Sequence, residues 1–246
     1  MANIEQQQQF WDDWNARTRE RERPEISNRQ AEVVLGWLRE LKRKDLNILE
    51  VGCGSGWFCN ELSPFGKVHG TDLSVNVLQR SQKKWPHVQF TAGDFFNLPF
   101  EKNSFDLVVT LEVLAHVENQ QLFLCRISEL LKEDGLLFLA TQNRHVLENY
   151  CKLPPPGEGQ VRRWVDRHEL KKLVEEKFSI CELRSVTPIA HKGFRRVLTS
   201  KKLNTAIRPL VGHSLRNYLE KNDCGWTLMV SARKNRYLAE TLSSSV

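Results

Sequence analysis

The residues best suited to chemistry lie in a turn where three glycines, Gly52, Gly54 and Gly56, alternate with other residues. The run from Leu46 to Val51 before this turn is apolar enough to be a buried strand of a parallel sheet. Glycine lets the backbone turn sharply and approach a ligand that a Cβ would keep away. The pattern after Gly56 is helical, so free N–H groups at a helix N-terminus would face an anionic or hydroxyl-rich ligand. The turn therefore predicts a ligand site, against the alternative of a strand–helix connection that binds nothing.

The spacing of the glycines and the position of a later carboxylate indicate which class of ligand the turn would bind. A dinucleotide fingerprint would require a glycine where Trp57 stands. The run Glu50-x-Gly52-x-Gly54-x-Gly56 instead resembles motif I of the class I S-adenosylmethionine (SAM) methyltransferases. The next expected strand ends at Asp72, where a carboxylate can accept hydrogen bonds from both hydroxyls of a ribose.

The resemblance extends along the chain to about residue 143. Gly93-Asp94 resembles the step that places an Asp beside the adenine amino group, although Asp94 could instead cap a turn. The segments Asn97–Phe100 and Ser104–Thr110 continue the pattern, and Leu111–Val117 is similar to a segment of the ubiquinone-biosynthesis type of methyltransferase. The resemblance implies SAM as cofactor, with S-adenosylhomocysteine as product. It places the cofactor contacts at Glu50, Gly52, Cys53, Gly54, Gly56, Asp72, Leu73, Asp94, Phe95 and Leu111.

His116 is the preferred catalytic residue. It follows the expected fourth strand, at the edge where α/β sheets place ligands. Histidine suits proton removal from a phenol or amine near neutral pH. The alternative is a histidine that only supports the fold. Glu112 and His116 are four residues apart, but two ligands without a third do not predict a metal site, so none is expected.

Composition fits one globular domain in a reducing compartment. The chain has 246 residues, of which 40% are hydrophobic and 27% charged. The six cysteines are scattered without a C-x-x-C pair, so they are expected to be free thiols. The polar N-terminus predicts no signal peptide, and the apolar runs are too short to span a membrane. A cytoplasmic protein is therefore expected.

Charge is distributed unevenly along the chain. Residues 1–143 carry 16 Lys and Arg against 20 Asp and Glu, whereas residues 144–246 carry 20 against 10. A basic face can attract a phosphorylated or carboxylated substrate, an acidic membrane surface or RNA. It can equally be an ordinary solvated surface.

The alternation of strands and helices predicts a doubly wound α/β fold. The resemblance implies a seven-stranded, mostly parallel sheet with an antiparallel last strand. Residues 46–235 are expected to form this Rossmann-like methyltransferase domain. Residues 1–45 are expected to form a helical lid, and 188–224 a helical insertion that caps the substrate pocket before the last strand. Asp166 and Glu169 predict a capping box at the start of a helix, and Ser74 is expected to cap another helix. Residues 236–246 are expected to form a flexible tail.

Four residues outside the cofactor motifs are candidate substrate contacts. Trp11 and Trp14 lie in the expected lid, and Arg144 and Trp164 in the expected loop 144–165. Arg144 ends Gln142-Asn143-Arg144, which stands where the resembled family often has Pro-Asn-Arg. Aromatic faces attract a sulfonium cation and can exclude water, although the two lid tryptophans could simply pack the segment onto the domain.

The sequence thus favours methyl transfer from SAM to oxygen or nitrogen of a small metabolite or natural product. Three alternatives stay open: an RNA or protein methyltransferase, a non-catalytic nucleotide-binding module, and a membrane-associated enzyme acting on an isoprenoid or lipid. The lack of an aromatic–basic run disfavours nucleic acid, while the basic insertion leaves peripheral membrane contact open. The oligomeric state and the acceptor are not indicated.

Overall fold

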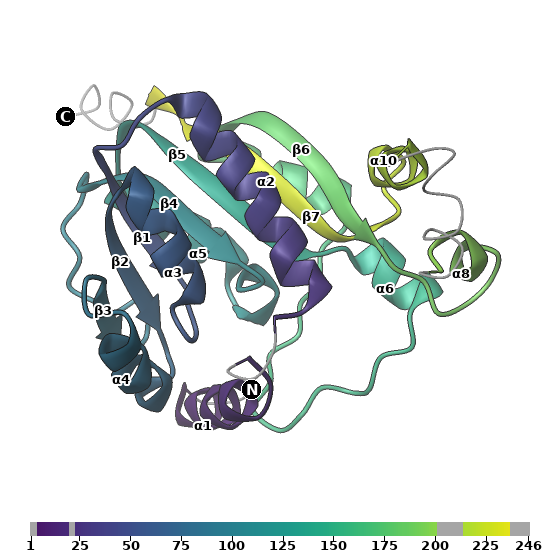
Figure 1. Ribbon diagram of the computed structural model, residues 1–246, viewed down its shortest axis with the longest axis horizontal. Helices are drawn as coiled ribbons and strands as arrows, with labels where there is room; N and C mark the ends of the chain where they lie inside the picture. The colour runs from purple at the N-terminus through teal and green to yellow at the C-terminus, as the bar shows by residue number, and fades with distance from the viewer. Residues whose placement is uncertain (1–3, 20–22, 201–213, 237–246) are drawn as a thin grey trace, which may run out of the picture.

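The computed structural model describes residues 4–19, 23–200 and 214–236. Its centre is a seven-stranded sheet in the order β3-β2-β1-β4-β5-β7-β6 (Figure 1). β7 runs antiparallel to both of its neighbours, and the other pairs are parallel. This is the predicted doubly wound fold with an antiparallel last strand. The strands are β1 Leu46–Val51, β2 Gly66–Asp72, β3 Gln89–Ala92, β4 Phe105–Leu111, β5 Leu131–Gln142, β6 Phe178–Pro188 and β7 Gly225–Lys234.

Helices cover both faces of the sheet. On one face α2, α3 and α4 pack against the strands, and α5 lies on the other face (Figure 1). α7 packs on the same face as α5, since Leu170 and Val174 belong to the same buried cluster. The central strands are buried on both sides, which explains their nearly continuous apolar sequence. The described helices are α1 Ile4–Trp14, α2 Glu25–Leu41, α3 Trp57–Leu62, α4 Val75–Lys84, α5 Gln120–Leu130, α6 Arg144–Tyr150, α7 Arg167–Glu175, α8 Arg195–Leu198 and α10 Ser214–Lys221.

The topology creates a ligand-binding edge. The chain goes from β1 outward to β2 and β3, then returns to place β4 on the other side of β1. The loops that follow β1 and β4 therefore lead away from each other. A crevice opens between these loops at the carboxyl ends of the two strands. The glycine turn follows β1, and the segment containing His116 follows β4.

Local capping agrees with the sequence at one helix and differs at another. The Asp166 side chain accepts the Glu169 N–H at the start of α7, and the Glu169 side chain accepts the Asp166 N–H, which confirms the capping box. The expectation for Ser74 is wrong. Ser74 occupies the N-cap position of α4, but its hydroxyl donates to the Asp12 carboxylate instead of capping its own helix.

The segment after β5 also differs from expectation. Residues 144–150, expected as part of a loop, form α6. Val146 and Leu147 are buried and pack near Cys151, against Trp164 and Trp226. Burial of this small apolar cluster stabilises α6, a helix that is too short to be predicted from its local sequence pattern.

The expected insertion is described only in part. α8 and α10 are its described helices, whereas residues 201–213 of the insertion lie outside the described residues. Of the expected tail, only Arg236 is described, and its guanidinium pairs with Asp134. None of the described helices combines the length and the apolar character needed to cross a bilayer.

Candidate active site

A cavity of about 690 Å³ lies at the carboxyl ends of the central strands. Its walls come from the glycine turn, the ends of β2 and β4, α1, and the segment from Leu153 to Trp164. Most of the predicted site residues meet here. Those that line the cavity are Trp11, Trp14, Glu50, Gly52, Cys53, Gly54, Asp72, Leu73, Asp94, Phe95, Leu111, His116 and Trp164.

The three glycines hold the turn in a conformation that other residues avoid. Their φ angles are 74°, 50° and 68° at Gly52, Gly54 and Gly56. A Cβ on Gly52 would lie 2.1 Å from the Cγ2 atom of Val113, and one on Gly56 would lie 2.6 Å from the Phe90 ring. Gly56 does not line the cavity; its lack of a side chain lets the turn pack against Phe90.

Asp72 is fixed at the end of β2 by two backbone donors. Its Oδ2 accepts the Gly54 N–H at 2.8 Å, and its Oδ1 accepts the Ser74 N–H at 2.9 Å. Burial raises the pKa of this carboxyl, and the two N–H donors oppose that rise. Each carboxylate oxygen has a further lone pair, so the oriented group can still accept from two vicinal hydroxyls.

Glu50 brings an unpartnered carboxyl oxygen to the cavity wall. Only 3% of the residue is exposed, and its Oε2 has no hydrogen-bond partner among the described residues. Burial raises the pKa of Glu50 to about 8. A buried acceptor without a partner fits a cationic or N–H-bearing group of a ligand, and the amino end of SAM supplies such a group.

The loop after β3 combines a structural and a cavity-facing role. Asp94 Oδ1 accepts the Phe96 N–H at 3.1 Å, and Asp94 Oδ2 accepts from the Asn97 side chain at 2.8 Å. Asp94 therefore caps a turn, as the alternative interpretation held. It also lines the cavity beside Phe95, so an adenine contact stays a prediction.

His116 has a defined tautomer. Its Nδ1 lies 2.8 Å from the Val161 carbonyl oxygen, which can only accept, so Nδ1 carries the proton and Nε2 the lone pair. Burial lowers the pKa of His116, the hydrogen bond to Val161 partly offsets this, and the Arg162 charge lowers it further. The ring is therefore neutral at pH 7 and able to take a proton.

α1 closes one side of the cavity and touches the candidate base. The Trp11 and His116 ring centroids are 4.7 Å apart, and those of Trp11 and Trp14 are 5.5 Å apart. Asp12 anchors the helix, because its carboxylate accepts from the Ser74 hydroxyl and, at 3.1 Å, from the Asn76 side chain. Both partners lie just beyond Asp72, so α1 is linked to the predicted ribose site.

The structure does not bring Arg144 to the cavity. Its guanidinium pairs with Asp166 and, at 2.9 Å, with Glu169, which ties the start of α6 to the start of α7. Trp164 does line the cavity, and the guanidinium of Arg162 lies 5.1 Å from the centroid of its ring.

A polar group that sequence reasoning did not assign lies beside the end of β4. Glu112 has φ of 65°, and its Oε1 accepts from the Gln30 side chain at 2.5 Å and from the Thr227 hydroxyl at 3.1 Å. The sequence offered a signal for a functional role of Glu112, since Glu112 belongs to the same motif as His116. It offered none for Gln30 and Thr227, because these residues lie on α2 and β7 and contact Glu112 only in the folded protein. Within the described parts of the chain, no three His, Cys, Asp or Glu side chains are grouped to hold a metal ion.

The sheet order, the glycine turn and the position of Asp72 at the end of β2 are those of the class I SAM-dependent methyltransferase fold. Comparison with known proteins agrees, since a family model described as a methyltransferase domain matches residues 49–139. The chain therefore contains a methyltransferase domain of this class, whose cofactor is SAM.

Among curated proteins, the chain is similar to the ubiquinone biosynthesis O-methyltransferase of Brucella anthropi. The two are 31% identical over 172 residues, which are 67% of this chain and 65% of that protein. The chain spans about half to two thirds of the length of the curated relatives it matches.

Two solved structures share the fold. A SAM-dependent methyltransferase from Mesorhizobium loti superposes with a TM-score of 0.59 at 22% identity, covering 80% of this chain and 96% of that one. The N-methyltransferase NodS from Bradyrhizobium japonicum, in complex with S-adenosylhomocysteine, superposes with a TM-score of 0.62 at 16% identity, covering 93% and 98%.

Proposed function

We propose that this protein transfers the methyl group of SAM to an oxygen or nitrogen atom of a small metabolite or natural product. One observation carries the proposal: a single cavity joins the glycine turn, His116 and the aromatic side chains of α1. A cofactor held at the turn and an acceptor held at His116 would thus share one enclosed space.

Each group of residues has a role in this proposal. Asp72 holds the ribose, and Glu50 faces the amino-acid end of the cofactor. SAM, when bound, supplies an electrophilic methyl group on its sulfonium. His116 Nε2 takes the proton that the acceptor O–H or N–H loses. Trp11 and Trp14 exclude water and align the acceptor, which accounts for much of the acceleration in a displacement of this kind.

The similar proteins support this acceptor class without naming the acceptor. The Brucella anthropi relative carries the name of an O-methyltransferase, and NodS that of an N-methyltransferase.

All six cysteines are free thiols, which suits the reducing cytoplasm that we propose as the site of action.

The test is methylation of a cell extract by the full chain. Purified protein is incubated with methyl-labelled SAM and either small-molecule extract, total RNA or total protein. We expect a mass increase of one methyl group on a small molecule, dependent on SAM and lost in Asp72→Ala. Label found only in RNA or protein would contradict the proposal.

A membrane-associated enzyme is a second candidate, favoured by one surface feature. Phe194 is 74% exposed and Val197 is 54% exposed, and the exposed Arg196 lies between them in sequence. Apolar side chains beside cations suit the boundary of an anionic bilayer. Flotation with anionic liposomes tests it: binding lost in Phe194→Ala supports membrane contact, and no flotation at low salt excludes it.

A further inference from the structure

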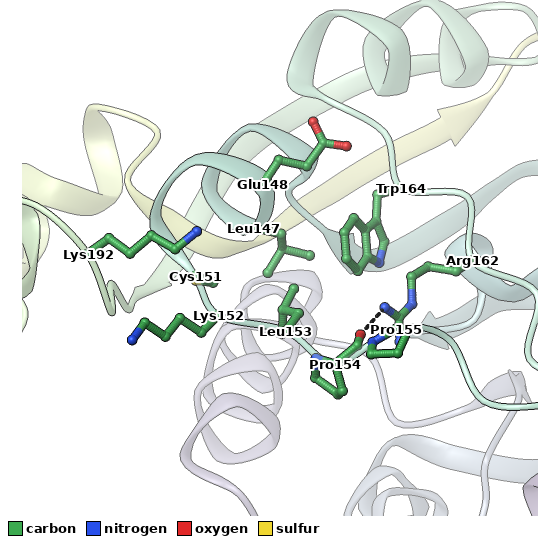
Figure 2. A pocket seen from close by; sticks show the side chains of 10 residues that line it. All are labelled: Leu147, Glu148, Cys151, Lys152, Leu153, Pro154, Pro155, Arg162, Trp164 and Lys192. Atoms are coloured by element: carbon green, nitrogen blue, oxygen red, sulfur yellow. Dashed lines mark hydrogen bonds between the residues drawn. The ribbon is translucent and has the colours of Figure 1, made fainter.

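A second cleft, of about 740 Å³, adjoins the cofactor cavity (Figure 2). Its floor is apolar, and five side chains line both hollows: Leu147, Leu153, Pro154, Arg162 and Trp164. A molecule whose reactive atom lies near His116 could therefore extend over this floor into the outer cleft. The remaining lining residues are Glu148, Cys151, Lys152, Pro155 and Lys192.

Two lysines that are forty residues apart in sequence are brought to one end of this cleft. The Tyr150 carbonyl accepts the N–H groups of both His191, at 2.6 Å, and Lys192, at 3.1 Å. The Lys152 N–H donates to His191 Nδ1 at 3.2 Å. These bonds dock the start of the insertion onto the end of α6, so Lys152 and Lys192 share one wall (Figure 2).

The cations of the cleft are not neutralised by the described part of the chain. Neither lysine ammonium forms an ion pair there, and Figure 2 shows the Glu148 carboxylate pointing away from Lys152. Arg162 donates to the Pro154 carbonyl at 2.7 Å and to Gln160 Oε1 at 3.0 Å, both uncharged acceptors. The cleft is therefore lined by three cationic side chains and one carboxylate, that of Glu148, around an apolar floor.

This arrangement fits a ligand with a charged end and an apolar body. We propose that the cleft is the acceptor subsite for an anionic group, a carboxylate or a phosphate, bound by Lys152 and Lys192. The apolar part of the acceptor lies over Leu147, Leu153 and Trp164, and Arg162 faces it from the opposite side. The inference rests on the proposed methyl transfer, and it adds the charge that the acceptor must carry.

A pair of fluorescent probes tests the subsite without turnover. 8-Anilinonaphthalene-1-sulfonate and N-phenyl-1-naphthylamine share an aromatic body, and only the first carries an anion. With the full chain saturated with S-adenosylhomocysteine, the sulfonate should bind at least about tenfold more tightly than the neutral probe. Lys152→Ala/Lys192→Ala should remove about this tenfold preference and leave the neutral probe unchanged.

A matched control removes the same two charges elsewhere. Lys67 and Lys83 are exposed in the nucleotide-binding half, so Lys67→Ala/Lys83→Ala should change the affinity of neither probe. The inference is overturned when the Lys152/Lys192 variant binds the sulfonate as tightly as wild type does. It is also overturned when the control variant loses as much affinity as that variant.

The acceptor itself is tested by fractionating cell extract. Aqueous and chloroform phases are each passed over an anion exchanger, and the retained and unretained fractions are incubated with labelled SAM. Label in a retained aqueous fraction indicates a soluble anion, and label in a retained chloroform fraction an anionic lipid; both support the inference. Label only in unretained fractions overturns the anionic subsite while methyl transfer stands. Label in no fraction counts against the proposed function, and the probe pair then decides the subsite separately.

Discussion

The fold raises the pKa of Glu50, so that the stability of the protein depends on pH. Burial raises this pKa to about 8, against an ordinary value of 4.5. In the unfolded chain the carboxyl ionises as the pH rises past 4.5, whereas the folded chain keeps its proton until about pH 8. Stability that is fully present below pH 4.5 is therefore lost progressively up to about pH 8.

Glu50→Gln should remove this loss, because glutamine cannot ionise. Without cofactor, we expect the variant to exceed wild type by on the order of 3 kcal/mol in free energy of unfolding at pH 7. At about pH 4.5 the difference should vanish. Urea unfolding at both pH values measures it, with the exposed Glu40→Gln as control. An equal difference at both pH values would show that the Glu50 carboxyl is not the titrating group.

His116 should determine the acidic limb of the pH–rate profile. Because burial lowers its pKa, activity should fall only as the pH drops through a value below the ordinary histidine pKa of about 6.5. His116→Gln should reduce turnover about 10²- to 10⁴-fold, remove that limb and leave the affinity for S-adenosylhomocysteine unchanged. A variant that keeps the limb would assign His116 to support of the Val161 segment alone.

At the scale of elements, α1 connects the two halves of the site. Its Asp12 bonds to Ser74 and Asn76 beside the predicted ribose site, and its Trp11 contacts His116. One helix thus contacts both the predicted cofactor side and the predicted acceptor side of the cavity. We propose that it acts as a lid over both.

Asp12→Ala should loosen this lid without unfolding the domain, since the buried clusters on the two faces of the sheet contain no residue of α1. We expect S-adenosylhomocysteine to dissociate about five- to tenfold faster, because two polar contacts that close the cavity are lost. Stopped-flow tryptophan fluorescence measures the rate. Asp13→Ala, at the exposed neighbouring position, is the control, and an equal rate in both variants would contradict the lid.

The elements that the sequence predicted well are those with a local signature. The glycine turn, the strand ending at Asp72 and the capping box at Asp166 depend on residues that are close in sequence. α6 and the Gln30–Glu112–Thr227 group could not be predicted in this way. They depend on burial against Trp226 and on contacts between α2, β4 and β7, which only the fold brings together.

At the scale of the whole molecule, the uneven charge acquires a location. The acidic half of the chain supplies Glu50 and Asp72, and the basic half supplies Lys152, Arg162 and Lys192. The imbalance of charge is visible in the sequence, and an anionic substrate was one of the interpretations that it suggested. The sequence could not place the cations, because Lys152 and Lys192 meet only through hydrogen bonds to Tyr150 and His191.

Calorimetric titration of the full chain with S-adenosylhomocysteine tests the cofactor site most directly. We predict one site per chain, with Asp72→Ala weakening binding by at least about tenfold because two charge-assisted hydrogen bonds to the ribose are lost. A nicotinamide dinucleotide should give no binding heat. Absence of S-adenosylhomocysteine binding, or unchanged affinity in Asp72→Ala, would contradict the cofactor site described here.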